Sequence, residues 1–242
     1  MFKKHEQKLG GNEMSFAAQS LYFGVVVSLL TYWLGMWLKK KLGWAVLNPI
    51  LVSVAVVIFL LKVLKVDYEV YNEGAKYISY LLTPATVCLA IPLYKQLELL
   101  KKNLTAVAAA ILAGVASSAV SIFALCLLFR MEHVYYVTLL PKSITTAIGM
   151  GVSEEAGGIV TITVVCIIVT GILGKMIGET VFKLIRLESP IAKGLALGTS
   201  AHAVGTAKAL ELGEIEGAMS SLSVAVAGLL TVLVVPLVSG LI

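Results

Sequence analysis

The sequence predicts an all-α, polytopic helical membrane protein with about six to eight membrane segments, some of them discontinuous or re-entrant. Two observations predict this class: 59% of the 242 residues are hydrophobic, and only 14% are charged. Soluble globular chains carry about 25% charged residues. Because a soluble domain of this length could not bury so much apolar surface, most of the chain is expected to face lipid.

The domain organisation follows from where the apolar runs begin. Residues 1–15 form a polar N-terminal segment, and residues 16–242 form a single transmembrane domain. The N-terminal segment is polar for too long to begin a cleaved signal peptide, and no small-residue cleavage pattern closes the first apolar run. We expect that run to be retained as a membrane anchor.

Five apolar runs are long enough for helices that cross the hydrocarbon core, which takes about 20 residues. They are Phe16–Leu38, Leu42–Leu61, Asn103–Phe129, Ala156–Gly174 with a continuation toward Phe182, and Gly217–Ile242.

Three further stretches are apolar but interrupted. Tyr77–Tyr94 contains Pro84 and Pro92, Val134–Ser153 contains Pro141 and Lys142, and Gly194–Glu211 contains four glycines with His202 and Lys208. Proline removes a helix hydrogen bond and glycine loosens the backbone. At membrane depth the freed polar groups persist only where protein or a wet cavity satisfies them. These stretches are therefore the predicted discontinuous or re-entrant helices.

The links between these runs predict an orientation. Basic residues gather at 39–41, at 95–102 and at 183–193, whereas the short link Asp67–Glu73 is acidic. The positive-inside rule places the basic links in the cytoplasm. The N-terminal lysines Lys3 and Lys4 argue against this assignment.

The spacing of the runs also suggests an internal, inverted repeat, with possible copies over residues 16–129 and 134–242. A shift of about 116 residues lays the broken stretch at 83–94 on the one at 199–210, as in transporters built from repeated broken helices. A different pairing sets residues 81–93 against residues 139–151, and both pairings stay open.

Lys142 heads the first candidate anion site. It lies in a broken apolar stretch beside the hydroxyl groups of Ser143, Thr145 and Thr146. A carboxylate favours such cationic and hydroxyl partners, and a half-helix N-terminus would add backbone donors. The alternative is a lysine that reaches back to the membrane surface while the threonines cap a helix.

The second candidate is the stretch with Thr199, Ser200, His202, Thr206 and Lys208. Ionisable residues inside a membrane are costly and suggest a functional site. His202 could carry a coupled proton because histidine titrates near neutral pH. The alternative is a neutral histidine bonded to a neighbouring helix.

Thr83 and Thr86 form the third candidate, which lacks charge and could line a path without binding an ion. We favour a packed proline kink at Pro84 as the explanation of this stretch.

Other classes of function find little support. No spacing resembles a protease, a phosphate-binding loop or a metal site, so we expect no enzyme activity, no cofactor and no metal. The basic residues fall in the links rather than on one face, which argues against nucleic-acid binding. The three cysteines lie apart in apolar runs, as expected of packing residues.

Three strings in the chain resemble signature segments of the LrgB/CidB family: TPATVCLAIPLYKQ, PKSITTAIGMGVSEEAGG and KGLALGTSAHAVGTAKALELGEIEGAMSSLS. The resemblance covers nearly the whole chain from about Phe16. It implies a multi-pass protein of the bacterial cytoplasmic membrane, associated with control of murein hydrolase activity and cell lysis. It also implies a small LrgA/CidA-type membrane partner and a homo-oligomer.

The resemblance leaves two functions open. Some relatives are linked to uptake of pyruvate, and plant relatives move glycolate and glycerate, which implies a carrier of small carboxylates coupled to a proton or sodium. Other members are described as holin-like or antiholin-like, which implies a pore-forming or pore-regulating protein. We favour the carrier, because a holin has little need of buried charge at broken helices.

Overall fold

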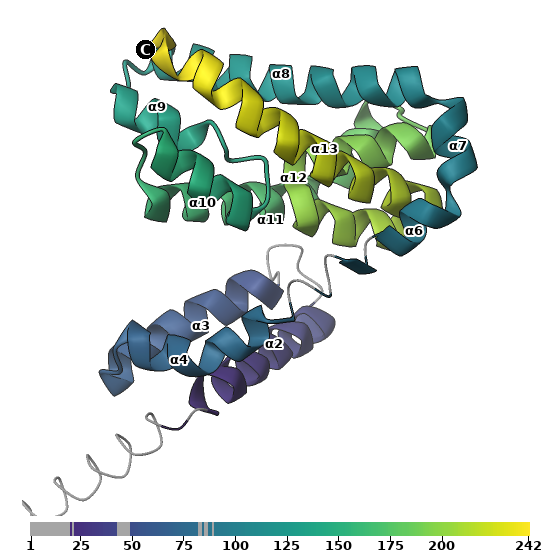
Figure 1. Cartoon of the computed structure of the whole chain (residues 1–242). Coiled ribbons are helices and arrows are strands. Elements are labelled where there is room, and N and C mark those ends of the chain that lie inside the picture. Colours follow the sequence, from purple (N-terminus) through teal and green to yellow (C-terminus); the bar gives the residue numbers. More distant parts are fainter. Residues whose placement is uncertain (1–19, 21, 43–48, 82–83, 85–86, 89) are drawn as a thin grey trace, which may run out of the picture. The chain divides into compact units, whose positions relative to one another are not determined.

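The computed structural model describes residues 20, 22–42, 49–81, 84, 87–88 and 90–242 (Figure 1). All regular secondary structure within these ranges is helical. The chain forms two compact units, Met1–Thr86 and Val87–Ile242. Three helices are long and apolar enough to cross a membrane in the described part of the chain: Leu104–Leu128, Val160–Leu184 and Glu214–Leu241. The predicted class is confirmed in this coarse sense, whereas the number of spans and the repeat stay predictions.

The first unit contains α2 (Phe23–Leu42), α3 (Pro49–Leu64) and α4 (Tyr68–Ser79). Both α3 and α4 pack against α2. Hydroxyl pairs join the helices: Ser28 Oγ lies 2.7 Å from the Tyr71 hydroxyl, and Thr31 Oγ1 lies 2.8 Å from Ser53 Oγ. Such pairs suit helices in lipid, where polar side chains find their partners across helix interfaces.

Of the helix expected over Leu42–Leu61, the structure describes the part from Pro49 onward as α3, and residues 43–48 lie outside the described residues. One element of this unit differs from the sequence-based expectation. The acidic stretch expected as a short link is the start of a helix, α4. Asp67 precedes it with an extended backbone, at the position where aspartate commonly begins a helix.

The second unit contains all the remaining elements, and Figure 1 labels its helices. They are α6 (Ala90–Lys95), α7 (Leu97–Lys102), α8 (Leu104–Leu128), α9 (His133–Leu139), α10 (Thr146–Glu155), α11 (Val160–Leu184), α12 (Pro190–Leu212), α13 (Glu214–Val238) and the 3₁₀ turn η1 (Ser239–Leu241).

Helices α8 and α13 run in the same direction through this unit. Val107 near the start of α8 shares an apolar cluster with Met219 near the start of α13, and Cys126 near the end of α8 shares another with Val235. Figure 1 shows α8 and α13 running toward the C-terminus together. Lys95 pairs with Glu214 at 3.3 Å where α13 begins. We call this end, where α8 and α13 begin, the basic end, and the other the opposite end.

Helices α8 and α11 end in the same kind of turn. Arg130 and Arg186 follow them with φ values of 50° and 54°, a conformation that L residues rarely adopt. The next amide bonds back across the turn, from Met131 to the Cys126 carbonyl at 2.9 Å and from Leu187 to the Phe182 carbonyl at 2.8 Å. These bonds satisfy carbonyls that a helix end leaves free. Each turn reverses the chain into the segment that carries a candidate site.

Candidate functional site

Two helix interruptions form the centre of the second unit. The chain leaves helical geometry between α9 and α10, over residues 140–145, which include Pro141 and Lys142. It also breaks inside α12 at His202, whose φ of 42° and ψ of −137° are not helical. Both breaks lie in stretches for which the sequence predicts broken helices.

The break at His202 turns α12 into a re-entrant hairpin. Leu197 and Ala209, which lie on the two sides of the break, pack in one apolar cluster with Phe182. The backbone of Gly205 also approaches the Leu197 carbonyl closely. In a straight helix Leu197 and Ala209 would be about 18 Å apart along the axis. The second half of α12 must therefore fold back beside the first.

The two interruptions enter the unit from opposite ends. The α9–α10 segment starts where α8 ends, and Tyr136 donates to the Val238 carbonyl at 2.9 Å near the end of α13. The α12 hairpin starts where α11 ends, and a Cβ on Gly194 would meet Met219 near the start of α13. Figure 1 shows α9 and α10 near the C-terminus and α12 toward the basic end.

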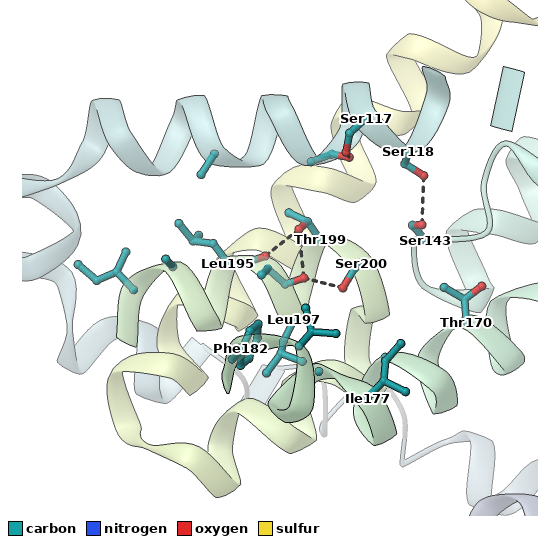
Figure 2. Close-up of a pocket in the computed structure, with 18 of the residues that line it drawn as sticks. Ser117, Ser118, Ser143, Thr170, Ile177, Phe182, Leu195, Leu197, Thr199 and Ser200 are labelled. Atoms are coloured by element: carbon teal, nitrogen blue, oxygen red, sulfur yellow. Dashed lines mark hydrogen bonds between the residues drawn. The ribbon is translucent and has the colours of Figure 1, made fainter. Parts of the chain in front are cut away.

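The two interruptions meet beside the middle of α8. Ser118 Oγ lies 3.2 Å from Ser143 Oγ, in the break between α9 and α10. One turn earlier on α8, a Cβ on Gly114 would lie 3.1 Å from Thr199, just before the break in α12. A small cavity of about 20 Å³ adjoins Ser118, Ser143 and Thr199. Figure 2 shows Ser118 and Ser143 pointing toward each other, with Thr199 and Ser200 on α12.

A larger cavity of about 860 Å³ leads to this meeting point between α8, α11 and the first half of α12. Asn103 and Ser189 line it at the ends of helices, Ser118 lines it at the middle of α8, and Lys142 lines it from the break between α9 and α10. From Asn103 to Ser118 the cavity follows α8 for about 22 Å, at 1.5 Å per helical residue. It therefore extends from the basic end to about the middle of the unit.

Lys142 supplies the positive charge of this cavity. Its side chain is half-buried, and its Nζ donates to Ser143 Oγ at 3.1 Å. No carboxylate of the described residues lies within 4.0 Å of Lys142 Nζ, whereas Lys95, Lys175, Lys183 and Lys208 all have such partners. A half-buried cation without an internal counter-ion, beside hydroxyl groups, is suited to bind a small anion.

The structure brings together four of the eleven residues that the sequence nominates. Lys142, Ser143, Thr199 and Ser200 all line the larger cavity. The hydroxyls of Thr199 and Ser200 donate to carbonyls of the preceding turn, at 2.8 Å to Leu195 and at 2.6 Å to Ala196. Thr145 ends the break and Thr146 begins α10, and neither threonine is among the lining residues of the cavity.

The other ionisable candidates lie elsewhere. Lys208 Nζ contacts Glu179 at 3.0 Å and Glu211 at 3.6 Å, in a group of ion pairs between α11 and the second half of α12. His202 is 4% exposed and bonds to the Ile167 carbonyl at 3.0 Å. Thr206 pairs with Ser220 at 2.9 Å. Thr83 and Thr86 lie outside the described residues.

Sequence reasoning missed several polar residues of the cavity wall. Asn103, Ser117, Ser118, Ser121, Thr170 and Ser189 also line it. A usable signal exists for α8, because Ser117 and Ser121 are one turn apart on a helix that is otherwise apolar. Within the described ranges, no three His, Cys, Asp or Glu side chains gather as a metal site would need.

Comparison with known proteins identifies the family of the chain. The model of the LrgB-like family matches residues 28–241. The chain is 41% identical over 217 residues to "Antiholin-like protein LrgB" of Bacillus cereus (strain B4264), covering 89% of this chain and 94% of the relative. The protein of the same name from Bacillus anthracis (strain CDC 684 / NRRL 3495) gives the same values. No solved structure matches the chain. The chain belongs to the LrgB-like family.

Proposed function

We propose that this protein is a membrane carrier of small carboxylates of the size of pyruvate, glycolate or glycerate, and not an enzyme. The observation that carries the proposal is Lys142, which has no carboxylate partner within 4.0 Å among the described residues and lies at the inner end of a cavity between three helices. A carboxylate there would receive a charge-assisted hydrogen bond from Lys142 and a neutral one from the hydroxyl of Ser143. The hydroxyls of Thr199 and Ser200 donate to the Leu195 and Ala196 carbonyls and would have to rotate to donate to it.

The arrangement also meets the physical conditions for a carrier site. Broken helices at membrane depth are tolerated where they line a cavity, and many secondary transporters bind their substrates at such breaks. Lys142 and Thr199 come from two breaks that enter from opposite ends, so a bound anion would touch both segments. A site shared by two segments can be opened from either side by moving one of them.

In this proposal the protein works in the bacterial cytoplasmic membrane, with the basic end toward the cytoplasm as the positive-inside rule favours. It acts as a homo-oligomer with a small LrgA/CidA-type membrane partner and couples transport to a proton or sodium. Its part in murein hydrolase control and lysis would then follow from carboxylate flux and its effect on the proton gradient.

Counterflow in proteoliposomes tests the carrier. Vesicles loaded with unlabelled pyruvate should accumulate external labelled pyruvate transiently, with saturation, and unlabelled glycolate or glycerate should compete. Lys142→Met should abolish the effect, whereas Lys101→Ala, on an exposed residue of α7, should leave most of it. Absence of saturable counterflow in folded protein would contradict the proposal.

A second candidate rests on the printed name of the relatives, "Antiholin-like protein LrgB". A holin-like or antiholin-like protein would form or regulate a pore by association in the membrane. It predicts leak of a dye such as carboxyfluorescein that rises steeply with protein density and does not change in Lys142→Met. Saturable counterflow without dye leak would exclude this function in favour of the carrier.

A further inference from the structure

The second unit contains two copies of one structural pattern. Residue 104 lies 56 residues before residue 160, and residue 128 lies 56 residues before residue 184, so the shift carries α8 onto α11 without a gap. The same shift carries Arg130 onto Arg186, both with positive φ. It also carries the α9–α10 segment onto the α12 hairpin to within one residue at each end.

The amino acids agree with this superposition at key positions. Pairs of identical residues at the 56-residue shift are Thr105 and Thr161, Ile111 and Ile167, Leu128 and Leu184, Arg130 and Arg186, Glu132 and Glu188, Leu139 and Leu195, Ala147 and Ala203, Gly149 and Gly205, Glu155 and Glu211, Gly157 and Gly213, and Ile159 and Ile215. They include the acid after each turn and a glycine after each break. The shift of about 116 residues expected from the run spacing is close to two such periods.

The copies must face opposite directions. In each copy a long helix crosses the unit, and a broken segment then returns to the end from which it entered. The next copy therefore begins at the other end. This is the topology of an inverted repeat, whose halves are related by an axis in the membrane plane.

The cavity lies where such an axis would pass. Five equivalent pairs line it: Gly114 and Thr170, Ser117 and Leu173, Ser118 and Gly174, Ser121 and Ile177, and Ser143 and Thr199. The same faces of α8 and α11, and the same positions of both breaks, therefore surround one space. Lys142 departs from the symmetry, because its equivalent in the second copy is Gly198. The cavity therefore receives a charged side chain from the first copy and none from the equivalent position of the second.

The 56-residue shift relates the entrance of this cavity at the basic end to a position at the opposite end, and that position is closed. Phe182 and Ala192 line the cavity toward the basic end. Their equivalents toward the opposite end are Cys126 and Tyr136, which are 1% and 0% exposed and share one apolar cluster. One entrance is thus open beside a small alanine, and its counterpart is filled by a tyrosine.

We propose that the protein exposes the Lys142 site alternately at its two ends, and that the second entrance opens between α8 and α9 where Cys126 now packs with Tyr136. This proposal rests on the carrier function above and adds its route. In the second state the α9–α10 segment moves away from the end of α8, while the α12 hairpin closes on α11 and α8 at the basic end.

Cysteine labelling tests this route, with Cys126 as a natural probe. Cys88→Ser and Cys166→Ser leave Cys126 as the single thiol, and a membrane-impermeant maleimide is applied to vesicles of known orientation. Adding Cys126→Ala and Ala192→Cys to this background gives a probe of the basic end. Adding Cys126→Ala and Leu128→Cys, at an exposed position on α8, gives a positive control for the opposite end.

Ala192→Tyr supplies the decisive perturbation, because it places at the open entrance the residue that fills the shut one. It should shift the population toward the second state and raise labelling of Cys126 from the opposite end at least about fivefold. Ala192→Ser should change it little.

Three outcomes would overturn the route. They are Cys126 reacting equally from both ends, reacting only from the basic end, or staying unreactive in a monodisperse Ala192→Tyr protein while Leu128→Cys reacts. Saturable counterflow together with an unreactive Cys126 would refute the route and leave the carrier intact. Labelling of Cys126 only from the opposite end and of Ala192→Cys only from the basic end, without pyruvate counterflow, would support the route and refute the proposed substrate.

Discussion

Replacing Lys142 with methionine separates binding from stability at the centre of the proposed site. Methionine keeps the length of the side chain and removes the charge and the donor to Ser143, which lies 3.1 Å away. Lys142 has no carboxylate within 4.0 Å in the described structure, so an entering carboxylate displaces no internal counter-ion. The full value of a charge-assisted hydrogen bond is then available to the ligand.

That value sets the size of the effect. A hydrogen bond to a charged group contributes about 1.5–3 kcal/mol, and about 1.4 kcal/mol corresponds to a factor of ten in affinity. Lys142→Met should therefore weaken pyruvate binding by about 10- to 100-fold. Because an unpaired, half-buried charge costs free energy, the same change should leave the melting temperature of the ligand-free protein unchanged or raised.

Isothermal titration calorimetry with pyruvate in nanodiscs measures the affinity, and a thermal scan without ligand measures the stability. Lys142→Arg keeps the charge with a different shape and should fall between wild type and Lys142→Met. Lys208→Met is the matched control, since Lys208 is already held by Glu179 and Glu211. Equal affinities for wild type and Lys142→Met would refute the assignment of the anion site.

Three further predictions concern the segments around the site. Glu179→Gln and Lys208→Met should each lower the melting temperature and keep pyruvate affinity within about threefold of wild type. A double-mutant cycle should show coupling between the two changes. Additive effects on stability would contradict a stabilising ion pair between Glu179 on α11 and Lys208 on α12. Gly198→Ala should destabilise the protein by about 1–3 kcal/mol, because its methyl group would collide with Ser223 and the Ser220 carbonyl. Gly151→Ala should stabilise the protein by about 0.5–1 kcal/mol, because no atom lies within 4 Å of the added methyl group. Equal effects of the two changes in chemical denaturation would contradict the packing described. His202→Ala should cost about 1–3 kcal/mol because the buried bond from its Nε2 to the Ile167 carbonyl is lost, while pyruvate affinity stays nearly constant. A large loss of affinity would restore His202 to the site.

The sequence predicts the broken helices better than it predicts the site they build. Proline at 141 and the glycines of residues 194–211 mark segments in which helices are easily interrupted, and the structure breaks the first segment over residues 140–145 and the second at His202. Their polar residues look equivalent in the sequence, because Lys142 and Lys208 both interrupt apolar stretches. Only the fold separates them, since the reversal at His202 carries Lys208 to Glu179 and leaves Thr199 beside Ser143.

The walls of the cavity could not be predicted for a related reason. Ser117, Ser118 and Ser121 read as ordinary small residues of a packed membrane helix, and their role depends on which face α8 turns toward α11 and α12. The period of 56 residues is hard to detect in the sequence because most equivalent positions of the two copies carry different residues. Equal helix lengths and the matching positive φ values reveal it.

The distance from a bound carboxylate to Lys142 tests the central claim most directly. Solid-state NMR on protein in lipid, with pyruvate labelled with ¹³C at the carboxyl carbon and lysine labelled with ¹⁵N at Nζ, reports this distance through dipolar dephasing. A carboxylate bonded to Lys142 should give a carbon-to-nitrogen distance of about 3–4 Å, and the dephasing should vanish in Lys142→Met. Dephasing that persists in Lys142→Met, or none at all while pyruvate is bound, would contradict a carboxylate site at the junction of the two broken helices.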